Sequence, residues 1–443
     1  MRSPLVPTVL WPVVEESFDE AEFLWRSWES SLDTHARNYR EVWFWTEDRL
    51  GGALDGVRLG QGKACEELLA PALRQGHNEH AFVVAAHVLA STSAGVAWEI
   101  LQPHLCTAKG QIGRLCGRAL ELATSSPQVR ALEENLHRMG AAGLPWLVAA
   151  RTFRRQQSAP ADVYDLATSH SADHRRVAMA AARLLRPHVA RQLIEPGLSD
   201  IDAHVVAAAT ESGLVHGLRS AWARCLELGA AQTVPSSFFW LSALGAERES
   251  RLLMAALAQP RSFELGLAAL GFLGTKEAAN VALQAMQNET HARLAAEAFC
   301  AITGLILPAN NLVAPEPAGV DELIPYELDD MNADLVPKLD DLLPLPDAAG
   351  VQRWWAQHEA HFDAHTRYIG GRPLCPEALH QALASGPMRR RHVLAFELAV
   401  RTGGACDLQT RAFYSLQRQQ LNAIAEHICS DALPFSIQQP GLA

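Results

Sequence analysis

The sequence predicts an all-α fold, a helical-repeat solenoid. Apolar residues recur at helical spacing almost throughout the chain, and alternating strand patterns are nearly absent. Alanine is abundant inside these stretches, and Pro or Gly falls between them, which is typical of short helices. The chain has 443 residues, whereas a single compact core rarely extends past roughly 250–300 residues. An elongated repeat array satisfies all three observations.

Several helical stretches also resemble one another. Each has a polar start, an aliphatic residue and then small residues at close helical spacing; they are residues 80–91, 174–185, 203–214, 263–274 and 291–302. In this alignment Ala178 matches Ala207, and Ala268 matches Ala295. Small residues at these positions let helices approach closely, and a helix pair of this size must stack on neighbours to bury its apolar face. A non-repeating helical bundle is the alternative.

Four regions follow from the composition along the chain. They are an N-terminal helical cap (1–75), a repeat array (76–306), an acidic, proline-rich connector (307–350) and a C-terminal helical module (351–443). The cap is rich in tryptophan, with Trp11, Trp25, Trp28, Trp43 and Trp45. The aliphatic residues of the connector predict that it packs on the solenoid.

The negative charge is concentrated in the connector. From Pro315 to Asp347 there are ten acidic residues and one lysine, which gives -9 of the total net charge of -11. The remaining chain carries -11 minus -9, or -2. Because phosphate contacts by basic residues supply most non-specific nucleic-acid affinity, we expect no nucleic-acid partner.

The N-terminus and the cysteines indicate a soluble, cytoplasmic protein. The first apolar run is short and interrupted by prolines, so it predicts neither a signal peptide nor a membrane span. No two of the eight cysteines are spaced as CxxC, and Cys116 and Cys300 lie on apolar helical faces. We therefore expect free thiols, largely buried, in a reducing compartment.

Two kinds of sequence motif carry a family resemblance. The pattern Asp173-x-Arg175-Arg176-x-Ala178 resembles the inner turn of a HEAT repeat. Residues 48–73, 343–373, 386–404 and 408–420 are similar to an uncharacterised proteobacterial HEAT-repeat family, whose members are often encoded beside type VI secretion genes. The resemblance implies a secretion-linked partner, and it provides no catalytic residues that could be assigned to this chain.

Histidines raise the question of a metal site. His358 and His361 are spaced i,i+3, and His361 and His365 are spaced i,i+4, so they are expected near one helical face. Zinc could use this spacing, but HExxH is absent and no fourth ligand is evident. A polar helix face is the favoured interpretation. GxSxG and GxxxxGK[ST] are also absent, so neither a metal nor a cofactor is expected.

The triplet Arg389, Arg390 and Arg391 is a candidate partner-binding site. It opens a predicted helix and falls on or near the polar side of that helix. It could pair with the acidic connector, for example with Asp329 and Asp330, or contact an acidic partner. The intramolecular pairing is favoured because the connector precedes this module.

Trp354 and Trp355 form a second candidate partner-binding site. Because the two positions are adjacent on a predicted helix, one indole should lie in the core and the other near the surface. An exposed tryptophan could anchor an interface.

These features together predict a non-enzymatic, protein-binding solenoid. The resemblance implies a type VI secretion effector toxin as the partner, with this protein acting as an immunity protein or, alternatively, as an adaptor that loads the effector. HEAT-like glycosylases and bilin lyases are less favoured, because no basic concave face or cofactor pocket is evident. We expect no membrane or small-molecule partner.

Overall fold

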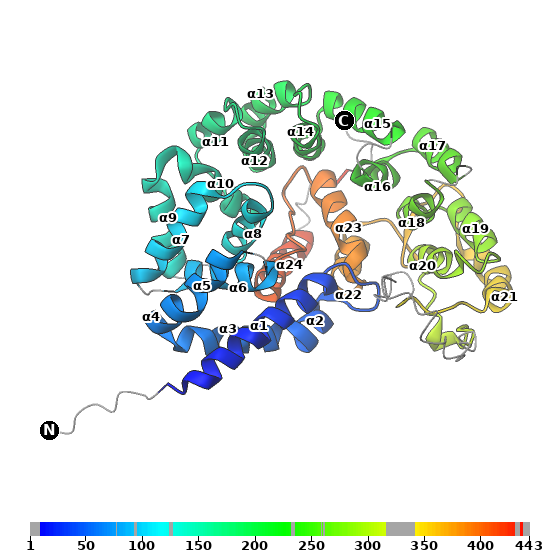
Figure 1. Ribbon diagram of the computed structural model, residues 1–443. Helices are drawn as coiled ribbons and strands as arrows, with labels where there is room; N and C mark the ends of the chain where they lie inside the picture. Colours follow the sequence, from blue (N-terminus) through cyan, green and yellow to red (C-terminus); the bar gives the residue numbers. More distant parts are fainter. Residues whose placement is uncertain are drawn as a thin grey trace, which may run out of the picture.

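The computed structural model describes residues 9–76, 78–92, 95–123, 127–231, 235–257, 259, 262–315, 342–429 and 435–436. Most of these residues are helical, which confirms the predicted all-α, helical-repeat solenoid. One antiparallel sheet is present, in which β1 (Tyr368–Ile369) pairs with β2 (Arg372–Pro373). The helices follow one another around a broad, curved ring (Figure 1).

The N-terminal cap consists of one long helix and two interrupted ones. Its elements are α1 (Trp11–Ser31), α2 (Tyr39–Val42), α3 (Asp48–Leu59), α4 (Gln61–Ala64) and α5 (Ala70–Gln75). The π-helical turns Trp43–Glu47 and Cys65–Leu69 join α2 to α3 and α4 to α5. Trp25 and Trp28 are almost fully buried, so two of the five cap tryptophans form the centre of its core.

The repeat array alternates between inner and outer helices. The inner helices are α6 (Glu79–Ser91), α8 (Gly110–Glu121), α10 (Leu144–Phe153), α12 (Ala172–Ala182), α14 (Ala203–Val215), α16 (Pro235–Leu244), α18 (Phe263–Leu273) and α20 (Ala292–Thr303). The outer helices are α7 (Gly95–Thr107), α9 (Pro127–Arg138), α11 (Pro160–Ala167), α13 (Pro187–Gly197), α15 (Arg219–Ala230), α17 (Glu247–Leu257) and α19 (Lys276–Ala285). From α6 to α14 and from α16 to α20, each inner helix stacks on the next, as in a solenoid, whereas α14 and α16 both pack against α23.

Small residues set the spacing between stacked helices. Ala178 of α12 and Ala209 of α14 are both fully buried where these helices pack together. Helices α12 and α14 begin at residues 172 and 203, a spacing of 203 − 172 = 31 residues. The predicted match of Ala178 with Ala207 is therefore two residues out of register, and Ala207 is only half-buried.

The beginnings and ends of the helices follow local chemistry. The side chains of Asn78, Asp202 and Thr275 accept hydrogen bonds from backbone N–H groups in the first turns of α6, α14 and α19. Helix α20 ends at Gly304, whose φ of +74° favours glycine. A Cβ there would lie 2.5 Å from the carbonyl oxygen of Gly370, so this glycine also allows the β1–β2 turn to approach.

Helix α21 (Ala348–His358) belongs to the array. It packs on α19, and the indole of Trp355 contacts the ring of Phe299 from α20. Backbone hydrogen bonds pair Ala314 with Leu345 and Asp347 with Leu312, so the two ends of the connector lie together. The predicted boundary at residue 351 divides this helix. In the structure the whole of α21 packs with the array, and the connector is an insertion in the sequence between α20 and α21.

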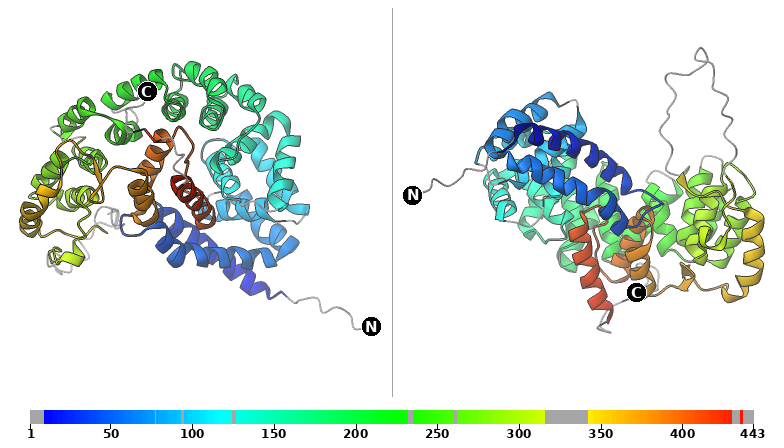
Figure 2. Two further views of the ribbon diagram at one scale, coloured as in Figure 1. Left: turned by 180° about the vertical axis from the view of Figure 1, so that it is seen from behind. Right: turned by 90° about the horizontal axis from the view of Figure 1, so that it is seen from below.

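The last three helices lie in the hollow of the ring. Helices α22 (Pro376–Ser385), α23 (Met388–Arg401) and α24 (Tyr414–Cys429) are surrounded by the array and the cap when the molecule is viewed from either side (Figures 1 and 2). Helix α23 packs against both α14 and α16. The concave side of the solenoid is therefore not an open surface along its whole length.

The helices form two hydrophobic cores. The first core contains buried residues of the cap, of helices α6 to α16 and of α22 to α24. The second contains buried residues of α16 to α21 and Tyr368 of the hairpin. Helix α23 therefore lies in the first core and beside the start of the second.

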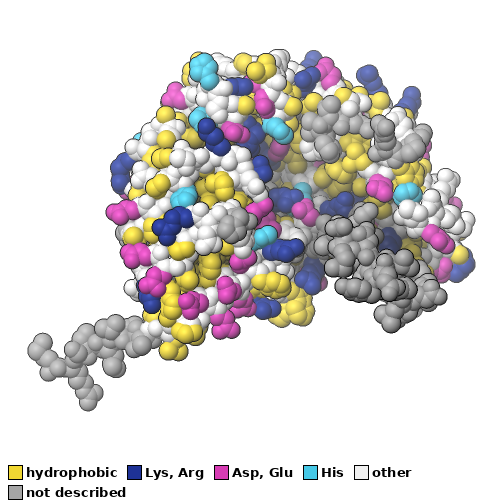
Figure 3. Space-filling model, viewed as in Figure 1, with side chains coloured by type: hydrophobic (Ala, Val, Ile, Leu, Met, Phe, Trp, Pro, Cys, Tyr) yellow, Lys and Arg dark blue, Asp and Glu magenta, His cyan; other side chains and the backbone are white. Residues whose placement is uncertain are grey.

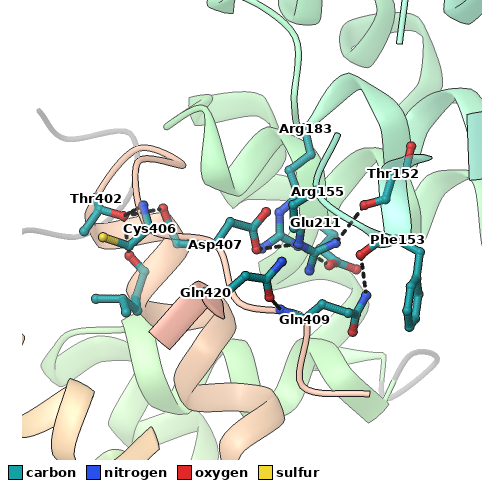
Figure 4. A network of polar contacts seen from close by, with 12 residues as sticks. Thr152, Phe153, Arg155, Arg183, Glu211, Thr402, Cys406, Asp407, Gln409 and Gln420 are labelled. Atoms are coloured by element: carbon teal, nitrogen blue, oxygen red, sulfur yellow. Dashed lines mark hydrogen bonds and ion pairs between the residues drawn. The ribbon is translucent and has the colours of Figure 1, made fainter. Parts of the chain in front are cut away.

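A buried carboxylate fixes the loop between α23 and α24 to the inside of the array (Figure 4). Asp407 accepts ion pairs from Arg155 at 3.0 Å and from Arg183 at 2.7 Å. Arg183 also contacts Glu211 of α14 at 2.8 Å. Arg155 follows α10, Arg183 follows α12 and Glu211 belongs to α14. This network therefore connects the loop before α24 to three successive repeats.

Candidate functional site

A groove crosses the inner surface of the N-terminal half of the array. Its volume is about 1240 Å³. We call it the inner groove, and it is lined chiefly by Trp25, Glu29, Glu79, His80, Val83, Lys109, Gly113, Arg114, Gly117, Arg118, Glu121, Trp146, Ser171, Asp173, His174, Arg176, Val177 and His204. These residues come from α1, from the inner helices α6, α8, α10, α12 and α14, and from the loop before α8.

Glycines of α8 deepen the groove. Gly110, Gly113 and Gly117 are spaced by three and four residues, so they share one face of this helix. The indole of Trp146 from α10 lies over that face, where a Cβ at Gly117 would be 3.6 Å from its Cζ3 atom. The half-buried Trp146 thus gives the groove an aromatic wall.

Charged residues of both signs line the inner groove. Lys109, Arg114, Arg118 and Arg176 supply four cations, and Glu29, Glu79, Glu121 and Asp173 supply four carboxylates, so 4 − 4 leaves no net charge. Charged side chains of both signs are also mixed over the face of the molecule shown in Figure 3. A phosphate backbone prefers a cationic surface, whereas a balanced groove suits a polypeptide with charges of its own.

Some of these charges are already paired within the protein. Arg118 donates from Nε to Glu29 at 2.7 Å and from Nη2 to the carbonyl oxygen of Arg411 at 2.9 Å. Glu79 accepts a hydrogen bond from Gln111. Lys109, Arg114 and Arg176, in contrast, make no hydrogen bond or ion pair within the part of the chain that the structure describes.

Among the carboxyl groups that line the groove, Glu121 has a raised pKa. Burial raises the pKa of Glu121 to about 7, despite the opposing effect of Arg118 and Arg176, and Glu29 adds to the increase. The side chain is half-buried, and no described residue donates a hydrogen bond to it. A desolvated carboxyl group in a cleft, with no internal partner, is a candidate functional group.

A second, smaller cavity lies where three distant parts of the chain meet. It has a volume of about 490 Å³ and lies between α20 and α22, with His35 of the α1–α2 loop and residues of the β1–β2 turn in its wall. We call it the junction pocket. Most of its surface is apolar, and its charged side chains are Arg293, Glu297, Arg372 and Arg390.

A buried charged cluster lies beside the junction pocket. Arg390 donates from Nε and Nη2 to the two carboxylate oxygens of Glu297. Nδ1 of His35 lies 3.5 Å from Glu297, and Arg389 donates to Nε2 of His35 at 2.6 Å. Although burial alone would raise it, Arg390 and His35 lower the pKa of Glu297 to about 2. The cluster therefore keeps an ionised carboxylate in the interior.

The prediction that the three arginines fall on or near a polar helix side is wrong for two of them. Arg390 and Arg391 are 7% and 0% exposed, and only Arg389 is half-buried. Arg391 donates to the carbonyl oxygen of Leu383 at 2.7 Å and to Gln417 at 2.6 Å. These two guanidinium groups lie inside the protein, because α23 is covered on several sides by neighbouring helices.

The predicted acidic partners of these arginines are outside the described residues. Asp329 and Asp330 lie in the undescribed part of the connector, so their pairing with the arginines stays a prediction. The carboxylate that the structure pairs with Arg390 is Glu297 of α20.

The two adjacent tryptophans divide as predicted. Trp355 is 4% exposed and donates from Nε1 to Asn280 at 2.7 Å. Trp354 is half-buried and stacks on His358, with ring centroids 4.2 Å apart. Both belong to the outer helix α21, and neither lines the inner groove or the junction pocket.

The three histidines do not share a helical face. Helix α21 ends at His358, a short 3-10 helix covers Glu359–His361, and His365 lies beyond it in a turn. The predicted common face is wrong because the helix stops one turn too early. No group of three or more His, Cys, Asp or Glu residues suited to a metal occurs among the described residues.

Sequence reasoning missed both the inner groove and Glu121. The glycine spacing in GQIGRLCG (110–117) was a usable signal, since three small residues on one helical face indicate a close approach. Glu121 had no such signal, because its environment is built from helices that are distant in the sequence.

The other sequence-based expectations have mixed outcomes. All eight cysteines are free thiols; Cys116 is buried, Cys300 is half-buried, and Cys106 and Cys429 are exposed. Within the described helices, none is long and apolar enough to cross a membrane. No family model matches this sequence, and no curated protein or solved structure matches it significantly.

Proposed function

We propose that this protein is a non-enzymatic, HEAT-like scaffold that binds a segment of a protein partner in its inner groove. The proposed partner is a type VI secretion effector toxin, which the protein neutralises as an immunity protein in the cytoplasm. The inner groove is the observation that carries the binding role. The resemblance of the chain ends to a secretion-linked HEAT-repeat family supports the identity of the partner.

The size of the groove suits a polypeptide. Pockets for small ligands have volumes of about 300–1,000 Å³, and the inner groove, at about 1240 Å³, is larger. It also spans five inner helices, so an extended or helical segment could contact several repeats at once. Protein interfaces of standard size bury about 1,600 Å², so the partner must also contact the surface around the groove.

The chemistry of the groove defines what the segment should present. Trp146 offers an aromatic wall, and Lys109, Arg114 and Arg176 offer cations without described partners. Glu121 offers a carboxyl group that would gain an ion pair from a lysine or arginine of the partner. A segment with mixed charge and one apolar anchor matches these groups, since complementary charges give specificity more than affinity.

Variants of the groove test the proposal directly. The toxin encoded beside this protein should be co-expressed with the wild type, with Arg114→Glu and with Glu121→Gln. Arg114→Glu should weaken binding by at least about tenfold, because it reverses a charge that the partner contacts directly. The matched control is Arg130→Glu on the outer helix α9, where an exposed arginine is reversed away from the groove; it should bind normally.

The same experiment separates the two roles. If the protein is an immunity protein, co-expression of the wild type rescues growth of the cell that makes the toxin, and Arg114→Glu lowers this rescue. If it is an adaptor, the toxin binds without rescue, and its export needs this protein. Binding that is equal for Arg114→Glu, Glu121→Gln and Arg130→Glu would exclude the inner groove, and failure to bind any neighbouring toxin would exclude the partner.

A further inference from the structure

The junction pocket has a distinct chemistry that the proposed protein-binding role does not use. Protein interiors are packed to a density of about 0.74, and voids larger than a water molecule are few. A pocket of about 490 Å³ between α20 and α22 is therefore a specific feature. It falls in the lower part of the volume range of about 300–1,000 Å³ that is typical of small-ligand pockets.

The two helices that form its walls present small residues to each other. On α20 and its C-terminal end these are Ala296, Ala301 and Gly304, and on α22 they are Ala378 and Ala382. The β1–β2 turn holds α20 in place, because Gly370 and Gly371 donate backbone hydrogen bonds to Ala301 and Ile302 at 2.7 and 2.8 Å. The gap between the helices is thus part of the folded architecture.

The charged side chains around the pocket are predominantly cationic. Three arginines and one glutamate line it, so the balance is 3 − 1 = +2 with His35 neutral. Arg390 has a side chain only 9% exposed and uses Nε and Nη2 on Glu297. No acceptor for its third nitrogen, Nη1, occurs among the residues that the structure describes. Arg372, at the edge of the pocket, is exposed and likewise has no described ion-pair partner.

We propose that the junction pocket binds a small amphipathic monocarboxylate, with its apolar body between α20 and α22 and its carboxylate near the arginines. Guanidinium groups suit carboxylates because their N–H donors match the two oxygens. The apolar walls contribute by removing hydrocarbon from water. The ligand class follows from this pairing of an apolar cleft with an excess of cations.

The test compares three probes that share one apolar chain. Octanoate, octan-1-ol and octylammonium should each be titrated into the full-length protein by isothermal calorimetry, with thermal stabilisation as a second measurement. Octanoate should bind at sub-millimolar concentration, and the alcohol and the ammonium should bind at least about tenfold more weakly, a difference of about 1.4 kcal/mol. Equal binding of all three, or no binding of octanoate, would overturn the proposal.

Substitutions then locate the binding. Ala382→Phe places a ring in the pocket and should abolish octanoate binding. The matched control is Ala356→Phe at an exposed position of α21, which should leave it unchanged. If circular dichroism shows that Ala382→Phe is misfolded, Ser385→Phe at the exposed edge of the pocket replaces it. Octanoate binding that persists in a folded, pocket-filling variant would contradict the location.

A double variant tests the role of the charge. Arg390→Met with Glu297→Met removes both partners of the ion pair together, which avoids leaving one buried charge unpaired. The apolar cleft should remain, so octanoate and octan-1-ol should then bind with similar affinity. An unchanged preference for octanoate would show that Arg390 does not recognise the carboxylate.

Discussion

His87 shows how burial determines the charge of a single residue. Its ring is 3% exposed, packs against Trp25 and Phe413, and has Nδ1 3.2 Å from the carbonyl oxygen of Ala119. Burial lowers the pKa of His87 from 6.5 to about 3, and the nearby Arg58 adds to this effect. The folded protein therefore keeps this imidazole neutral at pH values where an unfolded chain would protonate it.

This pKa shift predicts a loss of stability in mild acid. Below pH 6.5 the unfolded state binds a proton that the folded state does not, so the free energy of unfolding falls until the pH reaches about 3. From pH 7 to pH 5 the contribution of His87 should be a loss of about 2 kcal/mol. Urea denaturation at several pH values should show this slope in the wild type and a smaller slope in His87→Phe.

Glu47 changes the free energy of unfolding with pH in the direction opposite to His87. The pH slope of the wild type must therefore be compared with the slopes of variants. Burial raises the pKa of Glu47 from 4.5 to about 7, although Tyr414 and Trp28 donate hydrogen bonds to it. As the pH rises from 4.5 to 7, Glu47 ionises more readily in the unfolded chain than in the folded protein, so its contribution lowers the free energy of unfolding. His188→Phe, at an exposed position of α13, is the control and should keep the wild-type slope. An unchanged slope in His87→Phe would contradict the assignment.

Arg391 shows why sequence patterns misplace buried charges. An arginine at the start of an amphipathic helix counts as polar, so periodicity places it at the surface. In the structure Arg391 lies over the ring of Tyr39, with its Cζ atom 4.6 Å from the centroid. Burial lowers the pKa of Arg391 to about 9. Its acceptors Leu383 and Gln417 belong to α22 and α24, and one sequence cannot show that these helices enclose it.

At the scale of elements, α23 depends on a fully buried carboxylate. Glu397 accepts ion pairs from Arg367, which precedes β1, and from Arg401 of α23 at 2.7 Å. Both arginines also donate to the carbonyl oxygen of Ala243 in α16. Although burial alone would raise it, these arginines lower the pKa of Glu397. One carboxylate thus links α16, α23 and the hairpin.

Replacing this carboxylate should be strongly destabilising. Glu397→Gln leaves two guanidinium groups in the interior without their anion, and breaking a buried ion pair typically costs about 3–5 kcal/mol. Chemical denaturation at pH 7, followed by circular dichroism, measures the change. Because the folded-state pKa is lowered, the difference from the wild type should shrink as the pH falls below about 4.5. The control Glu426→Gln on the exposed side of α24 should change stability by less than about 0.5 kcal/mol, and an equal effect would contradict the argument.

The sequence predicted elements better than their assembly. Helical periodicity, alanine content and Gly or Pro punctuation are local, so they identified five helical stretches that correspond to α6, α12, α14, α18 and α20. The position of α21 was missed because the connector separates it from α20, which it joins in the second core. The different burial of Trp354 and Trp355 was predictable, since the side chains at adjacent helical positions point about 100° apart.

At the scale of the molecule, the C-terminal helices change what the solenoid can offer a partner. In a solenoid each repeat contacts only its neighbours, and the concave surface stays open. Here α22 to α24 lie inside the ring, and Asp407 pairs with Arg155 and Arg183, which follow the inner helices α10 and α12. The inner groove lies on the part of the inner surface between α6 and α14. Long-range packing of this kind leaves no trace in local periodicity, so the sequence could not locate the inner groove.

The same packing predicts cooperative unfolding of the two cores. A chain of repeats that contact only their neighbours can unfold in stages. Helix α23, however, belongs to the first core, and two ion pairs connect it to segments of the second core. They are Arg390–Glu297, which reaches α20, and Glu397–Arg367, which reaches the segment before β1. Hydrogen exchange in increasing urea, followed by mass spectrometry, should therefore show α6 and α18 losing protection at the same urea concentration. In Glu297→Gln combined with Glu397→Gln, α18 should lose protection first. Asp407→Asn breaks a contact inside the first core but leaves both coupling ion pairs intact, so α6 and α18 should still lose protection together, at a lower urea concentration than in the wild type. Two separate transitions in the wild type would show that α23 does not couple the cores and that each core unfolds independently.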